Sequence, residues 1–421
     1  MTRDFLFTCA GGLFLFSSFQ FLLAMLPLFL KEDLSGSDSA VGWIIGVFAF
    51  AALVPRVFIG REIDRGGSRR FLLAGAVIFV AASLSYLLAD SFATLMASRA
   101  LHGLGMACFH TAAFTFVAQI APPNRRAEAM GIWGVMSTVA TGFAPGGGLL
   151  VRDNLNNDAV FICSALMATV GVGLIYLVRD PVREAAEVVP LPVEAPLPTA
   201  DDLQPLVDRT HRRSRRTRSW PRPRRDGTGL LEPSVYLPAL LVLLLTWTFG
   251  AMQSFVLLFA KDRDIGGAGL YFTAYAGALL LARVIGGRVA DQRGRWAVIV
   301  PTLGLAAVAM LILIVVSSLP MLLLAGAIFG FAFGACQPAL TALAIDLVAP
   351  ARRGAGMATF TSAFELGIGS GSVIMGMIAA ATSYGTMFAI SAVFPVIGML
   401  IAIPASRASR RAAAPSTSGA A

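Results

Sequence analysis

Long, unbroken runs of hydrophobic residues, separated by short polar segments, occupy most of the chain. Each run holds about the 20 apolar residues that a helix needs to cross the hydrocarbon core of a bilayer. Because apolar and polar residues do not alternate within the runs, they predict membrane-spanning helices and argue against a membrane β-barrel. The twelve runs form two sets of six, near residues 5–30, 41–60, 71–89, 93–120, 128–150 and 159–178, then 234–260, 268–287, 297–317, 320–347, 355–380 and 385–405.

The composition fits a polytopic membrane protein and excludes three other classes. Hydrophobic residues make up 57% of the 421 residues and charged residues only 14%, and the mean hydropathy is +0.75. A soluble domain holds roughly 45–50% apolar and about 25% charged residues. The chain is therefore not a soluble globular enzyme, a disordered chain or a disulfide scaffold.

The sequence holds no recognisable catalytic or metal-binding pattern. Its four cysteines lie in apolar runs without the spacing of metal ligands. It contains neither a P-loop nor a nucleophile elbow. We therefore expect no enzymatic activity, no metal site and no cofactor.

The placement of basic residues predicts the orientation in the membrane. If the N-terminus is cytoplasmic, most of the 33 Lys and Arg fall in cytoplasmic segments, whereas Lys31, Arg152, Lys261 and Arg263 fall on the opposite side. Basic residues concentrate in cytoplasmic loops of membrane proteins. We therefore expect a multi-pass protein of the cell (inner or plasma) membrane with both termini cytoplasmic. The lipid bilayer then accounts for the net charge of +9 without a nucleic-acid partner.

The two sets of runs are an internal repeat. At one constant offset, polar and small residues of the first half meet the same residues of the second half over several spans. Such a duplication is typical of transporters, whose binding site lies near the bilayer midplane between the halves. The matched pairs include Arg56 with Arg283, Gly60 with Gly287, Asp64 with Asp291, Gly67 with Gly294, Gly103 with Gly330, Pro123 with Pro350, and Gly142 with Gly369.

The repeat divides the chain into four parts. The stretch between the halves is rich in proline and carries acidic residues first, then a run of arginines from Arg209 to Arg225. Such a stretch cannot bury a core, so we interpret it as a cytoplasmic connector that touches anionic lipid. A regulatory or nucleic-acid role for its arginines is the alternative. The expected parts are a six-helix bundle at 1–178, the linker at 179–233, a six-helix bundle at 234–405 and a cytoplasmic tail at 406–421.

Two polar segments carry a family resemblance. Gly60-Arg-Glu-Ile-Asp64-Arg65-Gly-Gly67-Ser-Arg69 and Gly287-Arg-Val-Ala-Asp291-Gln-Arg-Gly294-Arg295 both resemble the Gly-x-x-x-Asp-Arg-x-Gly-Arg signature of the major facilitator superfamily. The resemblance covers residues 1–178 and 234–405, although Glu62 and Gln292 depart from the pattern. It implies an all-α protein with twelve transmembrane helices in two pseudo-symmetric six-helix bundles.

The same resemblance implies a cytoplasmic gate. In the family, the N-terminal loop pins the start of the eleventh helix, which here is Arg353-Gly354-Ala355. A carboxylate such as Asp64 is stabilised at a helix N-terminus, so we expect Asp64 and Arg65 to latch the outward-open state. A mere topology signal is the alternative. The expected gate residues are Gly60, Asp64, Arg65, Gly67, Arg69, Gly287, Asp291, Gly294 and Arg295.

Two further segments resemble signatures of functional subgroups. Arg99-Ala-Leu-His-Gly-Leu-Gly-Met-Ala107 resembles the Arg-x-x-x-Gly-x-Gly-x-Ala pattern of proton-coupled members. Gly142-Phe-Ala-Pro145-Gly146-Gly-Gly148 resembles the antiporter signature Gly-Pro-x-x-Gly-Gly, with Ala144 in place of its glycine. A structural arginine and plain helix packing are the respective alternatives. Together the two segments favour export.

One acidic residue stands out among the 24, because only Glu365 lies near the middle of a span. A carboxylate in low dielectric holds its proton more tightly, which suits a group that binds and releases protons. A permanently protonated Glu is the alternative. His110 lies at a similar depth, as a cavity residue or a packing residue. We expect proton coupling by Glu365, Arg99 and His110.

Other polar side chains fall in helices that line the cavity in family members. They could bind a substrate, or they could simply pack in the helix core. The expected cavity residues are Gln20, His110, Trp247, Gln253 and Gln337.

These patterns predict a secondary active transporter that works by alternating access. We expect proton-driven export of drugs or small metabolites, with a small-molecule substrate, the proton as coupling ion and a monomeric protein. Proton-coupled uptake of a sugar or organic acid is one alternative, and a non-transporting membrane sensor or scaffold is another.

Overall fold

The computed structural model describes residues 2–122, 125–178, 232–349 and 352–413. Nearly all of the expected linker at 179–233 and the end of the tail lie outside these residues. Within them the side chains of a few further residues, among them Asp64 and Arg65, are also left undescribed.

Every regular element of the described residues is a helix. Twelve of the spans they form are long and apolar enough to cross a membrane, which confirms the all-α, twelve-helix prediction. The first span is made of two helices, because the helix is interrupted at Ala24 and Met25 and the second helix starts at Leu26, with Pro27 in its first turn. The α-helices are α1 (Arg3–Leu23), α2 (Leu26–Glu32), α3 (Asp38–Gly66), α4 (Ser68–Ser85), α5 (Phe92–Ile120), α6 (Arg126–Asn154), α7 (Asn157–Tyr176), α10 (Tyr236–Asp262), α11 (Leu270–Arg293), α12 (Trp296–Ile314), α13 (Leu319–Leu347), α14 (Arg353–Ala381) and α15 (Tyr384–Ala413), with 3-10 turns at Tyr86–Leu88 and Pro233–Val235.

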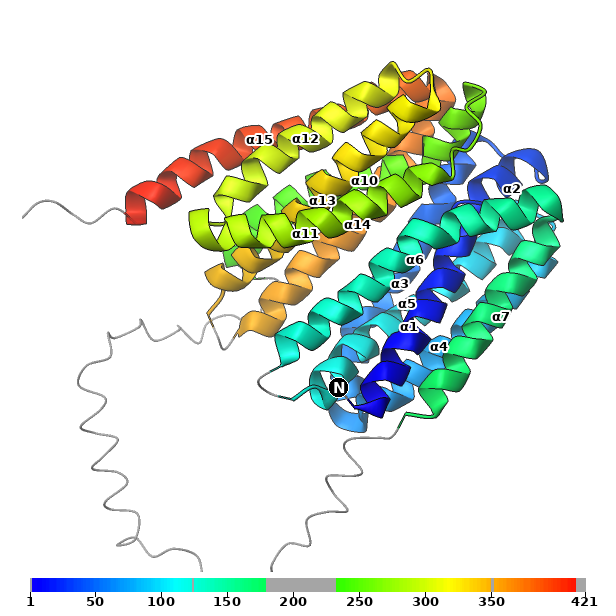
Figure 1. Cartoon of the computed structure of the whole chain (residues 1–421), viewed down its shortest axis with the longest axis horizontal. Coiled ribbons are helices and arrows are strands. Elements are labelled where there is room, and N and C mark those ends of the chain that lie inside the picture. Colours follow the sequence, from blue (N-terminus) through cyan, green and yellow to red (C-terminus); the bar gives the residue numbers. More distant parts are fainter. Residues whose placement is uncertain (1, 123–124, 179–231, 350–351, 414–421) are drawn as a thin grey trace, which may run out of the picture. The chain divides into compact units, whose positions relative to one another are not determined.

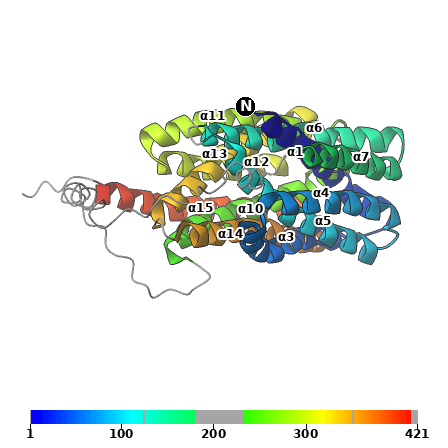
Figure 2. The same ribbon diagram turned by 90° about the horizontal axis from the view of Figure 1, so that it is seen from below.

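The helices form two groups of six spans, α1 to α7 and α10 to α15, which lie side by side (Figures 1 and 2). We call the end that holds the N-terminus and the start of α10 the terminal face. The opposite end, which holds Glu32 and the starts of α3 and α11, is the loop face.

The signature segments are largely helical, whereas the sequence placed them in loops. α3 continues through Asp64 to Gly66, and α11 continues through Asp291 to Arg293. Each helix ends only where a glycine takes a positive φ, at Gly67 (φ 85°) and Gly294 (φ 86°). Because side-chain-bearing residues rarely adopt this conformation, the repeated glycine sets both helix ends.

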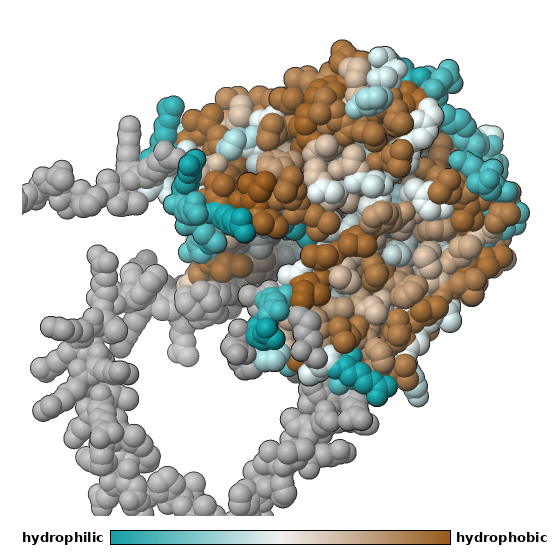
Figure 3. Space-filling model, viewed as in Figure 1, coloured by the Kyte–Doolittle hydropathy of each residue, from teal (hydrophilic) through white to brown (hydrophobic). Residues whose placement is uncertain are grey.

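The outer surface is apolar. Leu88, Phe143 and Leu150 are 75%, 69% and 65% exposed, and Figure 3 shows brown, hydrophobic residues across most of the viewed face. A water-soluble monomer rarely exposes patches of this size. The surface is therefore suited to contact with lipid chains.

The two halves meet along two seams that the internal repeat relates to each other. In the α3–α14 seam, a Cβ added at Gly369 would lie 3.0 Å from the Ala49 Cβ. In the α6–α11 seam, a Cβ added at Gly142 would lie 2.8 Å from the Ala276 Cβ. Small residues allow such close approach of membrane helices. The seams place α3 and α6 of the first half against α14 and α11 of the second half, respectively.

Candidate functional site: polar residues between the two halves

An ion pair crosses the α3–α14 seam near the middle of both helices. Arg56 Nη1 donates a hydrogen bond to Glu365 Oε1 at 2.7 Å. The two side chains are only 15% and 14% exposed. A charged group inside the membrane is costly unless it is paired, so the pair compensates two charges that would otherwise be expensive. The expected coupling carboxylate therefore has a partner, Arg56, in the other half.

The α6–α11 seam holds the counterpart of this pair. Arg283, the repeat partner of Arg56, donates from Nη1 to Thr138 Oγ1 at 3.0 Å and to the Gly134 carbonyl oxygen at 3.1 Å. Thr138 occupies the repeat position of Glu365. The same arginine thus reaches across each seam, but it meets a carboxylate in one seam and neutral oxygens in the other.

His110 lies at the depth of the Arg56–Glu365 pair. Arg56 and His110 both lie about five turns, or roughly 27 Å, from the loop-face ends of their helices. The His110 ring packs edge-on against Phe114, with centroids 4.7 Å apart, and lies within electrostatic range of the Arg56 charge. Of the three expected coupling residues, Glu365 contacts Arg56 directly, and His110 lies at a similar depth against Phe16 and Phe114.

Arg99 lies elsewhere, only about two turns or roughly 10 Å from the loop-face end of α5. Its side chain is fully buried. Nε donates to the Ile44 carbonyl oxygen at 3.0 Å, and the guanidinium lies 4.6 Å from the Phe48 ring centroid. These contacts join α5 to α3 within one half. A carbonyl and aromatic rings thus hold part of the guanidinium, as in the structural alternative, while Nη1 and Nη2 are buried without a hydrogen-bond partner among the described residues.

The other expected cavity residues make contacts within a single half or none. Gln20 Nε2 donates to Thr141 Oγ1 at 2.7 Å, and Trp247 Nε1 donates to Ser370 Oγ at 2.8 Å. The Gln337 amide bonds to its own helix at Thr341, 3.2 Å away. The half-buried Gln253 amide makes no hydrogen bond with the described residues.

The expected gate residues on the terminal face hold helices together within each half. Arg69 donates to the carbonyl oxygens of Val178 and Tyr176, at 2.9 and 3.0 Å, and so caps α7. Arg295 bonds to Asp291 at 2.9 Å and to Asp346 at 3.4 Å. These hydrogen bonds, above all the one to Asp291, raise the pKa of Arg295.

The latch expected at Asp64 and Arg65 falls on side chains outside the described residues, as do the surroundings of Gly60 and the first residues of α14. A Cβ added at Gly287 would meet nothing within 4 Å. The latch therefore stays a prediction.

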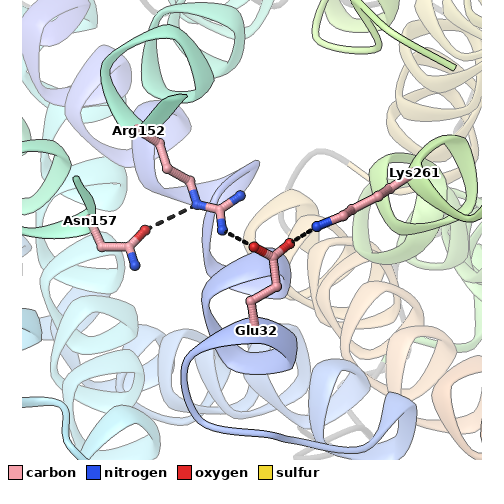
Figure 4. Close-up of polar contacts among 4 residues, drawn as sticks. All are labelled: Glu32, Arg152, Asn157 and Lys261. Carbon is pink, nitrogen blue, oxygen red and sulfur yellow. Dashed lines mark hydrogen bonds and ion pairs between the residues drawn. The ribbon is translucent and has the colours of Figure 1, made fainter. Parts of the chain in front are cut away.

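A polar cluster at the loop face joins the two halves, and the sequence did not reveal it. Glu32 at the end of α2 accepts from Arg152 Nη2 at 2.5 Å and from Lys261 Nζ on α10 (Figure 4). Arg152 is held in turn by Asn157 at 3.0 Å.

A second loop-face contact lies close to the first in sequence. The Tyr384 hydroxyl at the start of α15 donates to Asp38 Oδ1 at 2.6 Å, and the same oxygen lies 2.9 Å from Lys31 Nζ. From the sequence, Lys31, Arg152 and Lys261 contributed only to the prediction of membrane orientation. Their pairing depends on packing between distant helices, which the sequence pattern does not carry.

The inter-half polar contacts of the described residues lie at mid-membrane or at the loop face. On the terminal side, the surface is hollowed between the two groups of helices (Figure 3). At the loop face, the contacts of Glu32 with Lys261 and of Asp38 with Tyr384 thus hold the two halves together.

The family model of the Major Facilitator Superfamily matches both halves of the chain, over residues 8–267 and 239–420. The chain belongs to the major facilitator superfamily. It is thus a multi-pass membrane transporter that moves a small-molecule substrate.

Relatives and solved structures agree with this membership. An uncharacterised facilitator-type transporter of Burkholderia mallei (strain SAVP1) is 26% identical over 389 residues, which cover 90% of this chain and 86% of the relative. The human organic anion transporter TETRAN superposes with a TM-score of 0.67 at 19% identity, covering 95% of this facilitator and 99% of that chain. A bacterial homologue of the lysosomal transporter Spinster, inward-facing and unoccupied, gives 0.70 at 16% identity and covers 96% of both chains. At these identities the two structures bear on the fold alone.

Sequence reasoning missed Arg56 and Arg283 as site residues. Both are arginines inside spans, and the repeat aligns them with each other. The signal that could have found them is that two arginines inside apolar runs occupy the same repeat position.

Proposed function

We propose that this facilitator exports small molecules, drugs or metabolites, in exchange for protons, with Glu365 as the proton site. The observation that carries the proposal is the Arg56–Glu365 pair, because it joins the two moving halves at mid-membrane. An ionised Glu365 attracts Arg56 across the seam, whereas a protonated one does not. Proton binding therefore changes how strongly α3 and α14 hold together, which links protonation to the conformational cycle.

The antiporter-like segment of α6 supports exchange as the direction. Gly142 and Gly146 lie in the α6–α11 seam, where Thr273 Oγ1 donates to the Gly142 carbonyl oxygen at 2.7 Å. A segment at the contact between the two halves can influence how the halves rearrange. A segment that only packed helices within one half could not.

Charge placement supports a cytoplasmic terminal face in the cell membrane, since most basic residues fall on that side. In that orientation the loop-face contacts hold the outer side together while Glu365 is paired with Arg56, as expected after proton release to the inside. Each chain contains both halves of the pathway, so a monomer suffices.

The test uses inverted membrane vesicles acidified inside by respiration, with a pH-sensitive dye and a panel of cationic, neutral and anionic compounds. A transported compound should release protons from the vesicles and restore the dye signal in wild type. Glu365→Gln should abolish this response. The matched control is Glu128→Gln, because Glu128 is an exposed carboxylate paired locally with Arg125.

A response that persists unchanged in Glu365→Gln would contradict Glu365 as the proton site. Proton uptake into the vesicle lumen together with the substrate would show symport instead of exchange. Loss of the response in both variants would point to a general sensitivity to charge, which also contradicts the proposal.

A further inference from the structure

The two mid-membrane arginines are not equally neutralised. Among the described acids, only Glu365 lies at mid-span, and it is paired with Arg56. Arg283 bonds only to the neutral oxygens of Thr138 and Gly134. One positive charge therefore stays uncompensated in the middle of the membrane, where an unpaired charge normally marks a functional site.

The guanidinium of Arg283 has donors to spare. Both of its hydrogen bonds come from Nη1, so Nε and Nη2 make none with the described residues. Neither atom is among the buried polar atoms that lack a partner, which do include both terminal nitrogens of Arg99. The Nε and Nη2 groups of Arg283 are therefore accessible, and together they form the fork that binds a carboxylate through two parallel hydrogen bonds.

The part of α6 that faces Arg283 carries glycines instead of larger side chains. A Cβ added at Gly134 would lie 3.2 Å from Arg283 Nη1. Gly131, one turn closer to the terminal face and on the same side of α6, would meet nothing within 4 Å. A methyl group would thus meet the arginine at Gly134 and no atom within 4 Å at Gly131.

An aromatic cluster lies in the C-terminal half, on the loop-face side of Arg283. The half-buried Phe249 ring stacks on Phe333, with centroids 4.8 Å apart, and lies 6.4 Å from Tyr275. Tyr275 precedes Arg283 by about two turns on α11 and feels its charge. Tyr275 and Phe333 are only 2% and 9% exposed, so the half-buried Phe249 is the ring that an apolar ligand body can contact while its acidic group pairs with the arginine.

We propose that Arg283, assisted by Thr138, binds the carboxylate of an apolar organic anion, which is the substrate class of this transporter. The proposal rests on the transport function inferred above, but not on Glu365 being the proton site. In this proposal the Arg56–Glu365 pair of the α3–α14 seam binds the proton, and Arg283 of the α6–α11 seam binds the substrate anion.

The test measures binding in the absence of any proton gradient. Purified full-length protein is titrated with 2-naphthoate, its neutral amide and 2-naphthylmethylamine, and affinity is read from the ligand-dependent rise in unfolding temperature. Wild type should bind the carboxylate roughly tenfold or more tightly than the amide, as expected for a charge-assisted pair of hydrogen bonds.

Three variants locate the effect. Arg283→Gln should bind the carboxylate as weakly as the amide, and its unchanged affinity for the amide shows that it is folded. Arg283→Lys should keep part of the preference, since it retains the charge but not the fork. Arg407→Gln, at an exposed arginine of α15, should behave as wild type.

Equal affinity of wild type for the three compounds, or no binding at all, would overturn the proposal, as would a carboxylate preference that survives in Arg283→Gln. The outcome is separable from that of the vesicle experiment. A lost carboxylate preference in Arg283→Gln supports the anion site even if Glu365→Gln still exchanges protons, and the reverse result leaves only the proton site.

Discussion

The α3–α14 and α6–α11 seams descend from one repeated arrangement and differ at one decisive position. In both, a mid-span arginine reaches from the second or eighth span into the opposite half. It meets Glu365 in the first seam and Thr138 in the second. A single acidic residue thus separates a charge-neutral, protonatable contact from one that keeps its positive charge.

The seams also differ in how closely their helices approach on the loop side. A Cβ added at Gly42 of α3 would lie 2.4 Å from the backbone oxygen of Ser372. At its repeat partner Gly269, the first atom met is a Leu149 side-chain carbon at 3.1 Å. The α3–α14 seam is therefore the tighter one in this conformation. Duplication supplied the arrangement, and divergence gave each seam a separate property.

The largest effect should come from making the two seams chemically alike. Thr138→Glu places a carboxylate where Arg283 Nη1 now bonds to a hydroxyl, and so neutralises the uncompensated charge. We expect the variant to lose the preference for carboxylate ligands, by roughly tenfold or more, because its own carboxylate competes for the arginine. The preference should return as pH falls and the introduced carboxylate is protonated. The titration with naphthoate and its amide, repeated between about pH 5 and 8, measures this.

Thr138→Gln is the matched control, since it has the same size without the charge. It should retain the preference for the carboxylate at every pH. If Thr138→Glu binds the carboxylate as wild type does, the two seams are not separated by the charge at this position.

Much of the fold could be predicted because hydrophobic length and repetition are local or periodic properties. The twelve runs matched the twelve spans, and the paired glycines matched the paired helix ends at Gly67 and Gly294. The ends of α3 and α11 were misplaced, since hydropathy falls at Gly60 and Gly287 while no helix-breaking residue occurs for another turn or more. Polarity marks where a helix leaves the membrane, not where it ends.

The site was predicted only in part, for a related reason. Glu365 could be found by elimination, but its partner Arg56 lies 309 residues away along the chain, and pairing over that distance is decided by how helices pack. The coupling role of Arg99 was predicted from a resemblance to a family signature. In the structure its side chain is fully buried and bonds to the Ile44 carbonyl oxygen within one half. The loop-face partners of Glu32 likewise come from helices far apart in sequence.

A smaller effect should follow from filling the two seams unequally. Gly42→Ala should destabilise the protein by about 1–3 kcal/mol, because the new methyl group meets backbone atoms that cannot move aside. Gly269→Ala, its repeat partner, should cost less, because the nearest atom it meets belongs to the Leu149 side chain, which can rotate, and the nearest backbone atom, Gly146 Cα, is 3.3 Å away. Thermal unfolding in detergent measures both, and equal costs would show that the seams are equally tight.

The smallest effect should come from the loop face, where Glu32 ties Lys261 of the C-terminal half to Arg152 of its own half. The Glu32 side chain is 35% exposed, so water weakens the attraction, and such contacts are worth about 0–1 kcal/mol. Glu32→Gln should therefore raise the open fraction of the loop face only a few-fold. Distances between spin labels on cysteines placed at Ser35 and Asp264 report that fraction.

Asp33→Asn is the control for this change, because Asp33 is an exposed neighbour that makes no ion pair with the described residues. Raising the salt concentration should widen the distance distribution of wild type and of the control, since it screens the pairs. It should widen that of Glu32→Gln much less, because the screened pairs are already absent. A wild-type distribution that does not respond to salt or to Glu32→Gln would leave the tight packing of the α3–α14 seam as the main cause of loop-face closure. The two seams would then differ both in the charge at their central contact and in how far their packing holds the loop face closed.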